Sequence, residues 1–244
     1  MMGQDFSEIF TSLPPYSFNY FCFMRKLFFC LAVTAIFVAA SSIAQAQDDG
    51  AKEFAEYSAG VAISPFGPSL NLTYNIDAKN SISVGFGGAP EGDVPDGLLP
   101  DFDPLLLSEV SVAGSSSWLG VFWRHRPFAN QAIGFNLGMA SGQIENNVTA
   151  DGFHAGETVS FSVNYTENPV MYFGVSYGSK PVKGFQVGLD LGALSTGGAQ
   201  ILYTGEAEEL VAHGDDIADQ IAEINDKLAW TMLPNLQLSV SYGF

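Results

Sequence analysis

The sequence contains few residues that could catalyse a reaction. Its three histidines, His125, His154 and His213, are the candidates for general acid–base catalysis. A nucleophilic mechanism needs a reactive side chain beside a positioned base, and only Ser160 and Asp216 stand near a histidine, by sequence proximity alone. Three scattered histidines are ordinary background in a chain of 244 residues. We therefore predict no catalytic residues and no enzyme activity.

A group of aspartates, Asp93, Asp96, Asp101 and Asp103, is the strongest candidate for metal binding. Carboxylate oxygens are the ligands that Ca²⁺ and Mg²⁺ prefer. The spacing lacks the regular ligand order of a calcium-binding loop, so we expect weak attraction of divalent cations rather than a defined site. The sequence has no zinc-ligand spacing, phosphate-binding loop or dinucleotide fingerprint, and we expect no cofactor.

The charge balance argues against nucleic acid as a partner. The chain has 26 Asp and Glu against 9 Lys and Arg, which gives a formal net charge of −17. Binding to a phosphate backbone needs clustered Lys and Arg, and the sequence has no such cluster. Hydrophobic residues make up 47% of the chain and charged residues only 14%. This composition predicts one folded domain with a continuous apolar surface.

The first part of the chain has the pattern of a secretory signal peptide. A basic Met24-Arg25-Lys26 precedes an apolar stretch from Leu27 to Ala40, and small residues follow at Ala44 and Ala46. The apolar stretch is shorter than the roughly 20 residues that a spanning helix needs, which disfavours a membrane anchor. We therefore predict cleavage after Ala46, so that the mature chain begins at Gln47.

These features divide the chain into an N-terminal extension with its signal peptide, residues 1–46, and one domain, residues 47–244. The signal proper covers residues 24–46, and either Met1 or Met24 is the true start. Both cysteines, Cys22 and Cys30, precede the cleavage site. We therefore expect no disulfide in the mature protein.

The mature chain alternates between large apolar residues and small or polar ones. From Phe185 to Gly192, for example, the odd positions are Phe, Val, Leu and Leu, and the even positions are Gln, Gly, Asp and Gly. Alternation with period two predicts β-strands. The segments that follow this pattern are 56–64, 70–76, 81–87, 119–124, 133–140, 171–178, 185–192 and 236–244.

The small residues on the polar face decide between two all-β architectures. A water-soluble sandwich would bury its large residues and expose charged ones, but here the polar face is mostly Gly, Ser, Ala and Asn. Small residues fit the inside of a narrow closed barrel, and large apolar residues fit a lipid-facing exterior. We predict an all-β fold, an eight-stranded antiparallel transmembrane β-barrel, with a secreted soluble β-sandwich as the alternative.

The connections between these segments predict the orientation of the barrel. Short connections alternate with long acidic ones, as periplasmic turns alternate with outer loops in outer-membrane barrels. The end with the short connections also carries most of the bases of the mature chain, namely Lys52, Lys79, Arg124, Arg126, Lys180 and Lys183. The short connections are 77–80, 127–131 and 180–184, and the long ones are 88–108, 142–157 and 196–229. The exception is residues 65–68, a shortened first outer loop.

The last long connection contains a helical pattern. Ile217, Ile221, Ile224 and Leu228 recur at helical spacing, and Asp215 stands where an N-cap residue would. We predict a short amphipathic helix over residues 216–228 that packs on the rim of the barrel.

Polar residues on the inward face predict a network inside the barrel, and aromatic residues predict girdles at its two edges. We expect the network to stabilise the barrel rather than conduct solutes, because eight strands leave an interior just wide enough for side chains. The expected network residues are Glu56, Arg124, Asn136, Gln186 and Asp190. The expected girdle residues are Trp123, Tyr177, Trp230 and Tyr242, with Trp230 at the outer edge and Tyr242 at the inner one.

The C-terminal strand carries a resemblance to a known superfamily. Leu238, Val240, Tyr242 and Phe244 form an alternating strand that ends in Phe, and this strand resembles the assembly signal of Gram-negative outer-membrane barrels. With the signal peptide and the strand pattern, the chain resembles the small OmpA/OmpX/OmpW-like, porin-family outer membrane proteins. The resemblance implies insertion by the barrel assembly machinery, an outer-membrane location and contact with outer-membrane lipids and lipopolysaccharide.

The resemblance does not select one activity, because members of this superfamily differ widely in function. We expect a non-catalytic outer-membrane barrel with a structural, surface-interaction or small-solute passage role. Some barrels that this chain resembles modify lipids, so an outer-membrane lipid-modifying enzyme is the alternative.

Overall fold

The structure is a computed structural model, and it describes residues 53–94, 99–102, 108–128, 130–151, 158–205 and 214–244. The predicted signal peptide, with Met24, Ala44, Ala46 and Gln47, lies outside the described residues. The predicted domain boundary after residue 46 lies outside them as well.

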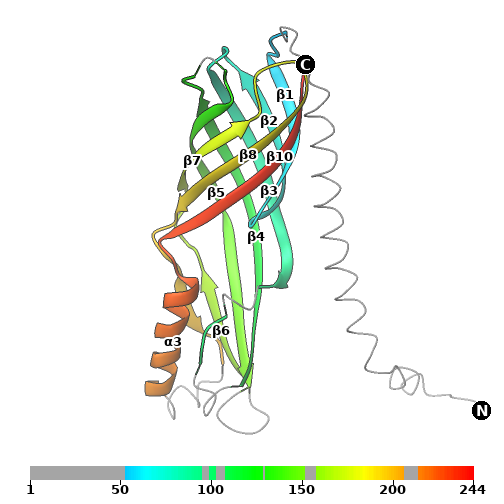
Figure 1. Ribbon diagram of the computed structural model, residues 1–244. Helices are drawn as coiled ribbons and strands as arrows, with labels where there is room; N and C mark the ends of the chain where they lie inside the picture. Colours follow the sequence, from blue (N-terminus) through cyan, green and yellow to red (C-terminus); the bar gives the residue numbers. More distant parts are fainter. Residues whose placement is uncertain (1–52, 95–98, 103–107, 129, 152–157, 206–213) are drawn as a thin grey trace, which may run out of the picture. The chain divides into compact units, whose positions relative to one another are not determined.

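The described residues form an antiparallel β-structure with one helix (Figure 1). The strands are β1 (Tyr57–Ser64), β2 (Gly67–Asn75), β3 (Asn80–Asp93), β4 (Ser108–His125), β5 (Ile133–Asp151), β6 (Thr158–Asn164), β7 (Val170–Gly178), β8 (Gly184–Ser195), β9 (Gln200–Tyr203) and β10 (Met232–Gly243). The helix is α3 (Gly214–Leu228).

Eight of these strands close into a ring. Their order is β1-β2-β3-β4-β5-β7-β8-β10, and β10 pairs again with β1. At the closing seam the backbone N–H of Phe244 donates to the carbonyl oxygen of Tyr57 at 3.0 Å. The prediction of an all-β, eight-stranded antiparallel barrel is confirmed, and the soluble β-sandwich is wrong because the sheet has closed on itself.

Short turns join the strands at the end of the barrel where β1 begins and β10 ends, which we call the short-turn end. In the β2–β3 turn, the Asp77 carboxylate accepts hydrogen bonds from the backbone N–H groups of Lys79 and Asn80 at 2.6 and 2.8 Å. This Asx-type turn lets two adjacent strands reverse within four residues.

The exterior of the barrel is apolar over its whole circumference. Large side chains at the outward positions are about half exposed, among them Leu72 at 63%, Leu119 at 57% and Tyr177 at 62%. A protein in water would lose stability by leaving so many large apolar side chains uncovered. The exterior therefore fits a surface that lipid covers. Among the described residues, no helix is both long enough and apolar enough to span a bilayer.

Strands β4 and β5 continue past the barrel and build a second structure, which we call the cap. The cap consists of residues 108–117 of β4 and 141–151 of β5, together with β6, β9 and α3. Strand β6 pairs with the extension of β5, and β9 pairs with β6. The buried side chains of this second core are Val112, Val148, Ala150, Val159, Phe161, Val163, Ile217, Ile224 and Leu228.

Within the barrel, β5 shows the outward-apolar alternation that the sequence predicts. Leu137 and Met139 point outward with 50% and 52% of their surface exposed. Their neighbours Asn136 and Ala140 point inward and are buried at 4% exposure each. The alternation of side chains follows from the strand pleat, which sends successive residues to opposite faces.

In the cap, the same strand keeps its alternation but reverses its polarity. The outward residues Gln143 and Glu145 are polar and exposed, whereas the inward residues Val148 and Ala150 are apolar and buried. Strand β4 changes in the same way, from outward Leu119 to exposed Ser117 and buried Val112. The change falls at residue 118 of β4 and residue 140 of β5, which are close neighbours in the pairing of the two strands.

The long connections that we predicted as loops are therefore partly strand. Residues 142–151 belong to β5, residues 88–93 to β3 and residues 200–203 to β9. The prediction failed there because we identified strands by large apolar residues at the positions that face outward in the barrel. Strands β5 and β6 alternate in the cap too, with the apolar parity exchanged.

The helix predicted over residues 216–228 is confirmed as α3, but it packs against the cap core and not on the rim of the barrel as we predicted. Ile217, Ile224 and Leu228 are buried in that core. Lys227 forms a 3.1 Å ion pair with Asp101, and the hydroxyl of Tyr165 donates a hydrogen bond to the carbonyl oxygen of Leu228. The helix is thus fixed at its C-terminal end.

Candidate functional site

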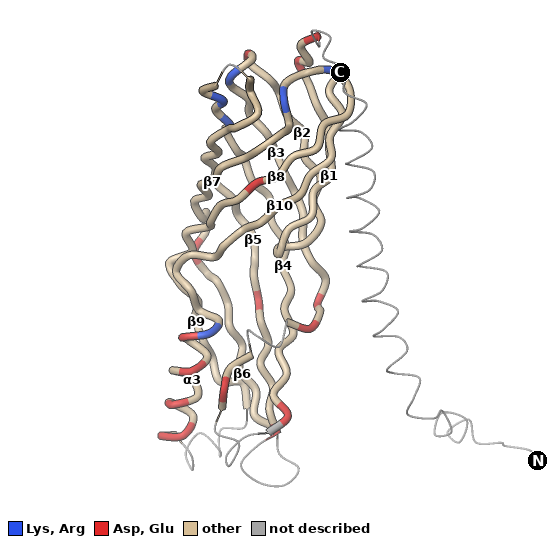
Figure 2. The backbone as a smooth tube through the Cα atoms, viewed as in Figure 1, with Lys and Arg blue, Asp and Glu red and all other residues tan. Residues whose placement is uncertain are grey.

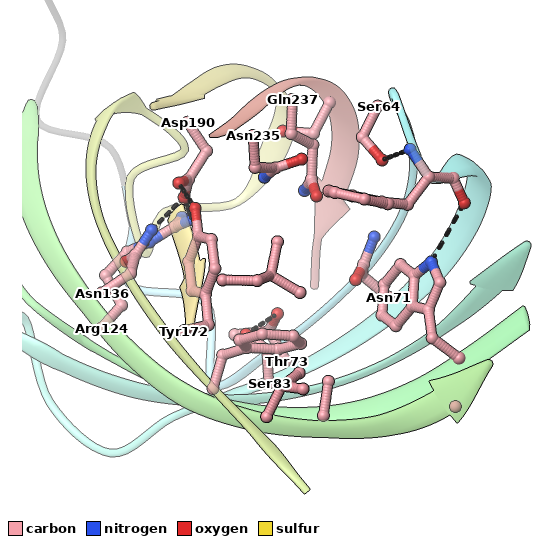
Figure 3. A pocket seen from close by; sticks show the side chains of 18 of the residues that line it. Ser64, Asn71, Thr73, Ser83, Arg124, Asn136, Tyr172, Asp190, Asn235 and Gln237 are labelled. Atoms are coloured by element: carbon pink, nitrogen blue, oxygen red, sulfur yellow. Dashed lines mark hydrogen bonds and ion pairs between the residues drawn. The ribbon is translucent and has the colours of Figure 1, made fainter. Parts of the chain in front are cut away.

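The interior of the barrel contains a cavity of about 140 Å³ (Figure 3). Its lining extends from Arg126 and Lys180 at the short-turn end to Tyr165 and Glu167 below the cap. The residues come from most strands of the ring, because every inward position faces the same space.

One side of the cavity is aromatic. The ring of Phe122 packs edge-on against Trp118 and Tyr172, with centroid distances of 6.2 and 5.6 Å. These rings need the inward glycines around them: a Cβ on Gly120 would lie 2.6 Å from Phe122, and one on Gly174 would lie 2.6 Å from the Tyr172 hydroxyl oxygen. The small inward residues of the sequence therefore make room for a few large ones.

Amides and hydroxyls line the rest of the cavity. Figure 3 shows Asn235 and Gln237 on the side away from the aromatic rings, and Asn71 and Thr73 beside the rings. Thr73 and Ser83 share a hydrogen bond of 2.8 Å between their hydroxyl oxygens. The Oδ1 atom of Asn235 is buried and has no hydrogen-bond partner among the described residues. The cavity is therefore polar in this part and suits water or a small polar molecule.

A buried polar network spans the middle of the barrel. The Arg124 guanidinium pairs with the Asp190 carboxylate at 3.3 Å and donates through Nε to Asn136 Oδ1 at 2.8 Å. Asn136 Nδ2 and the Tyr172 hydroxyl donate to the two oxygens of Asp190. Every group in this cluster has a partner, which a buried ion pair needs in order to be tolerated.

The structure brings together three of the five residues that we expected in this network, Arg124, Asn136 and Asp190. Gln186 is buried on the inward face, but its Nε2 has no partner among the described residues. Glu56 differs from the expectation, because it precedes β1 and is exposed to solvent. Tyr172 joins the network although we did not name it. The sequence does contain a signal for it, because Tyr172 is a large hydroxyl-bearing residue among inward positions that otherwise carry small residues.

A second arginine, Arg126, is buried at the short-turn end with 2% of its surface exposed. Its Nη1 donates to Ser81 Oγ at 3.1 Å, and its Nη2 donates to the carbonyl oxygen of Ser179 at 3.0 Å. The sequence placed Arg126 at this end of the barrel among the other bases, and it gave no signal that the side chain is buried.

The predicted girdle residues lie on the outward face. Trp123, Tyr177 and Tyr242 are 43%, 62% and 47% exposed and lie toward the short-turn end, while Trp230 precedes β10 at the opposite end and is 40% exposed. Further aromatic residues accompany them at the short-turn end, and Tyr57 contacts Tyr74 with 5.4 Å between ring centroids.

Leu238, Val240 and Tyr242 occupy alternate positions of β10, and Phe244 follows the last residue of that strand. Tyr242 packs against Phe185 with 5.0 Å between ring centroids, and Phe244 is 57% exposed. Their side chains are thus available on the surface of the last strand.

The acidic candidates for metal binding do not meet in the structure. Asp93 is exposed at the end of β3, and Asp101 is held by Lys227, while Asp96 and Asp103 lie outside the described residues. Within the described part of the chain, no three His, Cys, Asp or Glu side chains gather in a metal-binding arrangement.

The histidines give no catalytic arrangement in the part of the chain that the structure describes. Nδ1 of His125 lies 2.9 Å from Asn80 Oδ1, and its ring packs beside Trp123. His154 and His213 lie outside the described residues.

The ring closure, apolar exterior and polar interior define a small β-barrel of the outer-membrane type. The fold comparisons agree. The structure of Acinetobacter baumannii CarO matches with a TM-score of 0.53 and 16% identity, covering 78% of this chain and 98% of that one. The structure of A. baumannii CarO2 matches with a TM-score of 0.54 and 16% identity, covering 79% and 100%. The predicted resemblance to small outer-membrane barrels is therefore confirmed at the level of the fold.

A major outer membrane protein from Thermus thermophilus matches with a TM-score of 0.46 and 12% identity, covering 79% of this chain and 100% of that one. No protein-family model and no curated protein matches the sequence.

Proposed function

We propose that this protein is a non-catalytic outer-membrane barrel that presents a folded cap at the cell surface. The observation that carries the proposal is the reversal of polarity along β4 and β5. Apolar side chains face outward only up to residues 119 and 139, and beyond them the outward face is polar. A strand that leaves lipid and enters water changes its outward residues in this way.

The orientation follows from the two ends of the barrel. The short-turn end holds Lys79, Arg126, Lys180 and Lys183, whereas acidic residues dominate the cap (Figure 2). Outer-membrane barrels have short periplasmic turns and longer outer segments, so the short-turn end faces the periplasm. The C-terminal strand, with Phe244, supports insertion by the barrel assembly machinery.

The interior supports a surface role more strongly than free passage. The rings of Phe122 and Tyr172 and the Arg124–Asp190 pair occupy the middle of a narrow eight-stranded barrel. Small-solute passage is the second candidate, because the cavity is lined by residues from both ends, Lys180 at one and Glu167 at the other.

Planar-bilayer recording of the folded protein distinguishes the two candidates. We expect no stepwise conductance from the native barrel, and stepwise conductance from a variant in which Phe122→Ala and Tyr172→Ala remove both rings. Phe135→Ala, which removes an outward ring, is the control and should stay silent. Stepwise conductance from the native protein would favour passage and contradict the closed barrel.

A further inference from the structure

The short-turn end of the cavity contains a buried charge without an ion-pair partner. Arg126 is 2% exposed, and it forms no ion pair with any carboxylate of the described residues. A buried charge is normally paired, because removing it from water is costly. Arginine does not escape this cost by losing its proton at neutral pH.

The nearby acidic groups are engaged elsewhere or remain in solvent. Asp190 pairs with Arg124, and Glu53 pairs with Lys183 at 2.8 Å. Asp77 accepts hydrogen bonds within its own turn, and Glu56 is exposed. The described part of the protein therefore places no carboxylate in contact with Arg126.

The Arg126 side chain also has hydrogen bonds left to give. A guanidinium carries five N–H donors, and Arg126 uses one on Ser81 and one on Ser179. Its Nε is buried and has no partner among the described residues. Arg126 lines the cavity, so this side chain with unused donors forms part of the wall around a guest molecule.

The surroundings of Arg126 reinforce its charge. Lys180 and Arg124 line the same cavity, as do the hydroxyl-bearing Ser58 of β1 and Ser241 of β10, two strands that do not pair with β4. The cavity, at about 140 Å³, is several times larger than the roughly 10–15 Å³ that one water needs. This volume belongs to the whole lumen, from Arg126 to Glu167, and it is enough in total for an oxyanion of four or five heavy atoms.

We propose that the periplasmic end of the lumen is a binding site for a small oxyanion, a carboxylate or phosphate, held by Arg126 and assisted by Lys180. Guanidinium groups bind carboxylate and phosphate oxygens through charge-assisted hydrogen bonds. The site admits its anion from the periplasm, because the acidic cap repels anions from the outer side. This inference does not depend on the closed or open state of the barrel.

Titration calorimetry tests the site on the folded protein at low ionic strength, with acetate and inorganic phosphate as probes. We expect saturable binding of at least one probe to the native barrel. Arg126→Gln should weaken it by about tenfold or more, the loss expected for a charged hydrogen bond, and Lys180→Gln should weaken it less.

The matched control is Lys183→Gln, which removes a cation from the same turn but outside the cavity lining. We expect it to bind like the native protein. Absence of saturable heat from the native barrel, or equal losses in Lys183→Gln and Lys180→Gln, would overturn the site. Should Arg126→Gln fail to fold, the pair at positions 180 and 183 decides the question alone.

Discussion

The barrel and the cap share two strands, yet the barrel exposes apolar side chains and the cap exposes polar ones. In the barrel, β4 and β5 turn apolar side chains outward and small or polar ones inward. In the cap, the same strands turn Gln143 and Glu145 outward and bury Val112 and Val148. The pleat is continuous through both regions, so what changes is the choice of residue on each face.

The two regions also differ in what fills their interiors. The cap is closed by apolar packing, with Phe161, Ile217 and Ile224 at 1% exposure or less. The barrel interior contains an ion pair, amides and the aromatic rings of Trp118, Phe122 and Tyr172, which pack over glycines. An apolar interior is unnecessary in the barrel because the lipid outside already covers the apolar residues. The two regions show that a sheet covered by lipid can have a polar interior, whereas a sheet exposed to water buries apolar residues.

The largest effect is expected from breaking the polar network of the barrel. Asp190→Leu leaves Arg124 buried without its partner, and we expect a loss of about 3–5 kcal/mol in the free energy of unfolding. Urea unfolding from lipid vesicles measures it. Glu145→Gln, an exposed change in the cap, is the control and should cost almost nothing. A cost below about 1 kcal/mol for Asp190→Leu would mean that the network does not stabilise the barrel.

The next effect locates the membrane along β5. Leu137→Arg places a charge on the lipid face and should cost about 2–4 kcal/mol near the midplane. Gln143→Arg changes the same outward face of the same strand, six residues further, and should cost close to zero. Equal costs at the two positions, measured by unfolding in lipid, would contradict the assigned boundary.

A smaller effect is expected from filling the space over a barrel glycine. A Cβ on Gly138 would overlap the ring of Phe122 and lie 2.7 Å from the carbonyl oxygen of Val121. We expect Gly138→Ala to cost about 1–3 kcal/mol. Phe122→Leu in the same chain should recover part of that loss. A double-mutant cycle with additive costs would show that the ring and the glycine are not coupled.

The smallest effect concerns the cap, where the ion pair of Lys227 with Asp101 is largely exposed. The hydrogen bond that Lys227 donates to Asp101, and the negative charge of that carboxylate, raise the pKa of Lys227 above its ordinary value. A raised pKa stabilises the folded cap at neutral pH, and this contribution disappears as pH rises through the pKa of Lys227. Above about pH 10.4, the ordinary pKa of Lys, hydrogen exchange of α3 should therefore accelerate slightly more in the native protein than in the Asp101→Asn variant. Identical pH profiles would show that the pair contributes nothing.

Much of the barrel could be predicted from the sequence, because each strand carries its own alternation. The helix was predictable for the same reason, since Ile217, Ile224 and Leu228 recur at a helical interval. Strand β6 also alternates, with Val159, Phe161 and Val163 buried and Ser160 and Ser162 between them. We did not predict this strand because we expected every strand to carry its large apolar residues on the outward face, as the barrel strands do.

The interior site was only partly predictable. Parity placed Arg124, Asn136 and Asp190 on the inward face of three strands, and the ring closure brought them together. Parity could not reveal the burial of Arg126, which follows β4 in a turn and depends on Ser81 of β3 and on Ser179, which follows β7. Closure of the barrel brings these three residues together, and a local sequence pattern cannot predict such a contact.

The central claim is that the reversal of polarity on β5 marks the outer boundary of the membrane and exposes the cap at the cell surface. Single cysteines at the outward positions Leu137, Met139, Ser141, Gln143 and Glu145, in a chain lacking Cys22 and Cys30, test it with a membrane-impermeant maleimide on intact cells. The account predicts labelling at 141, 143 and 145 and protection at 137 and 139. Protection of residue 143, or labelling of residue 137, would contradict it.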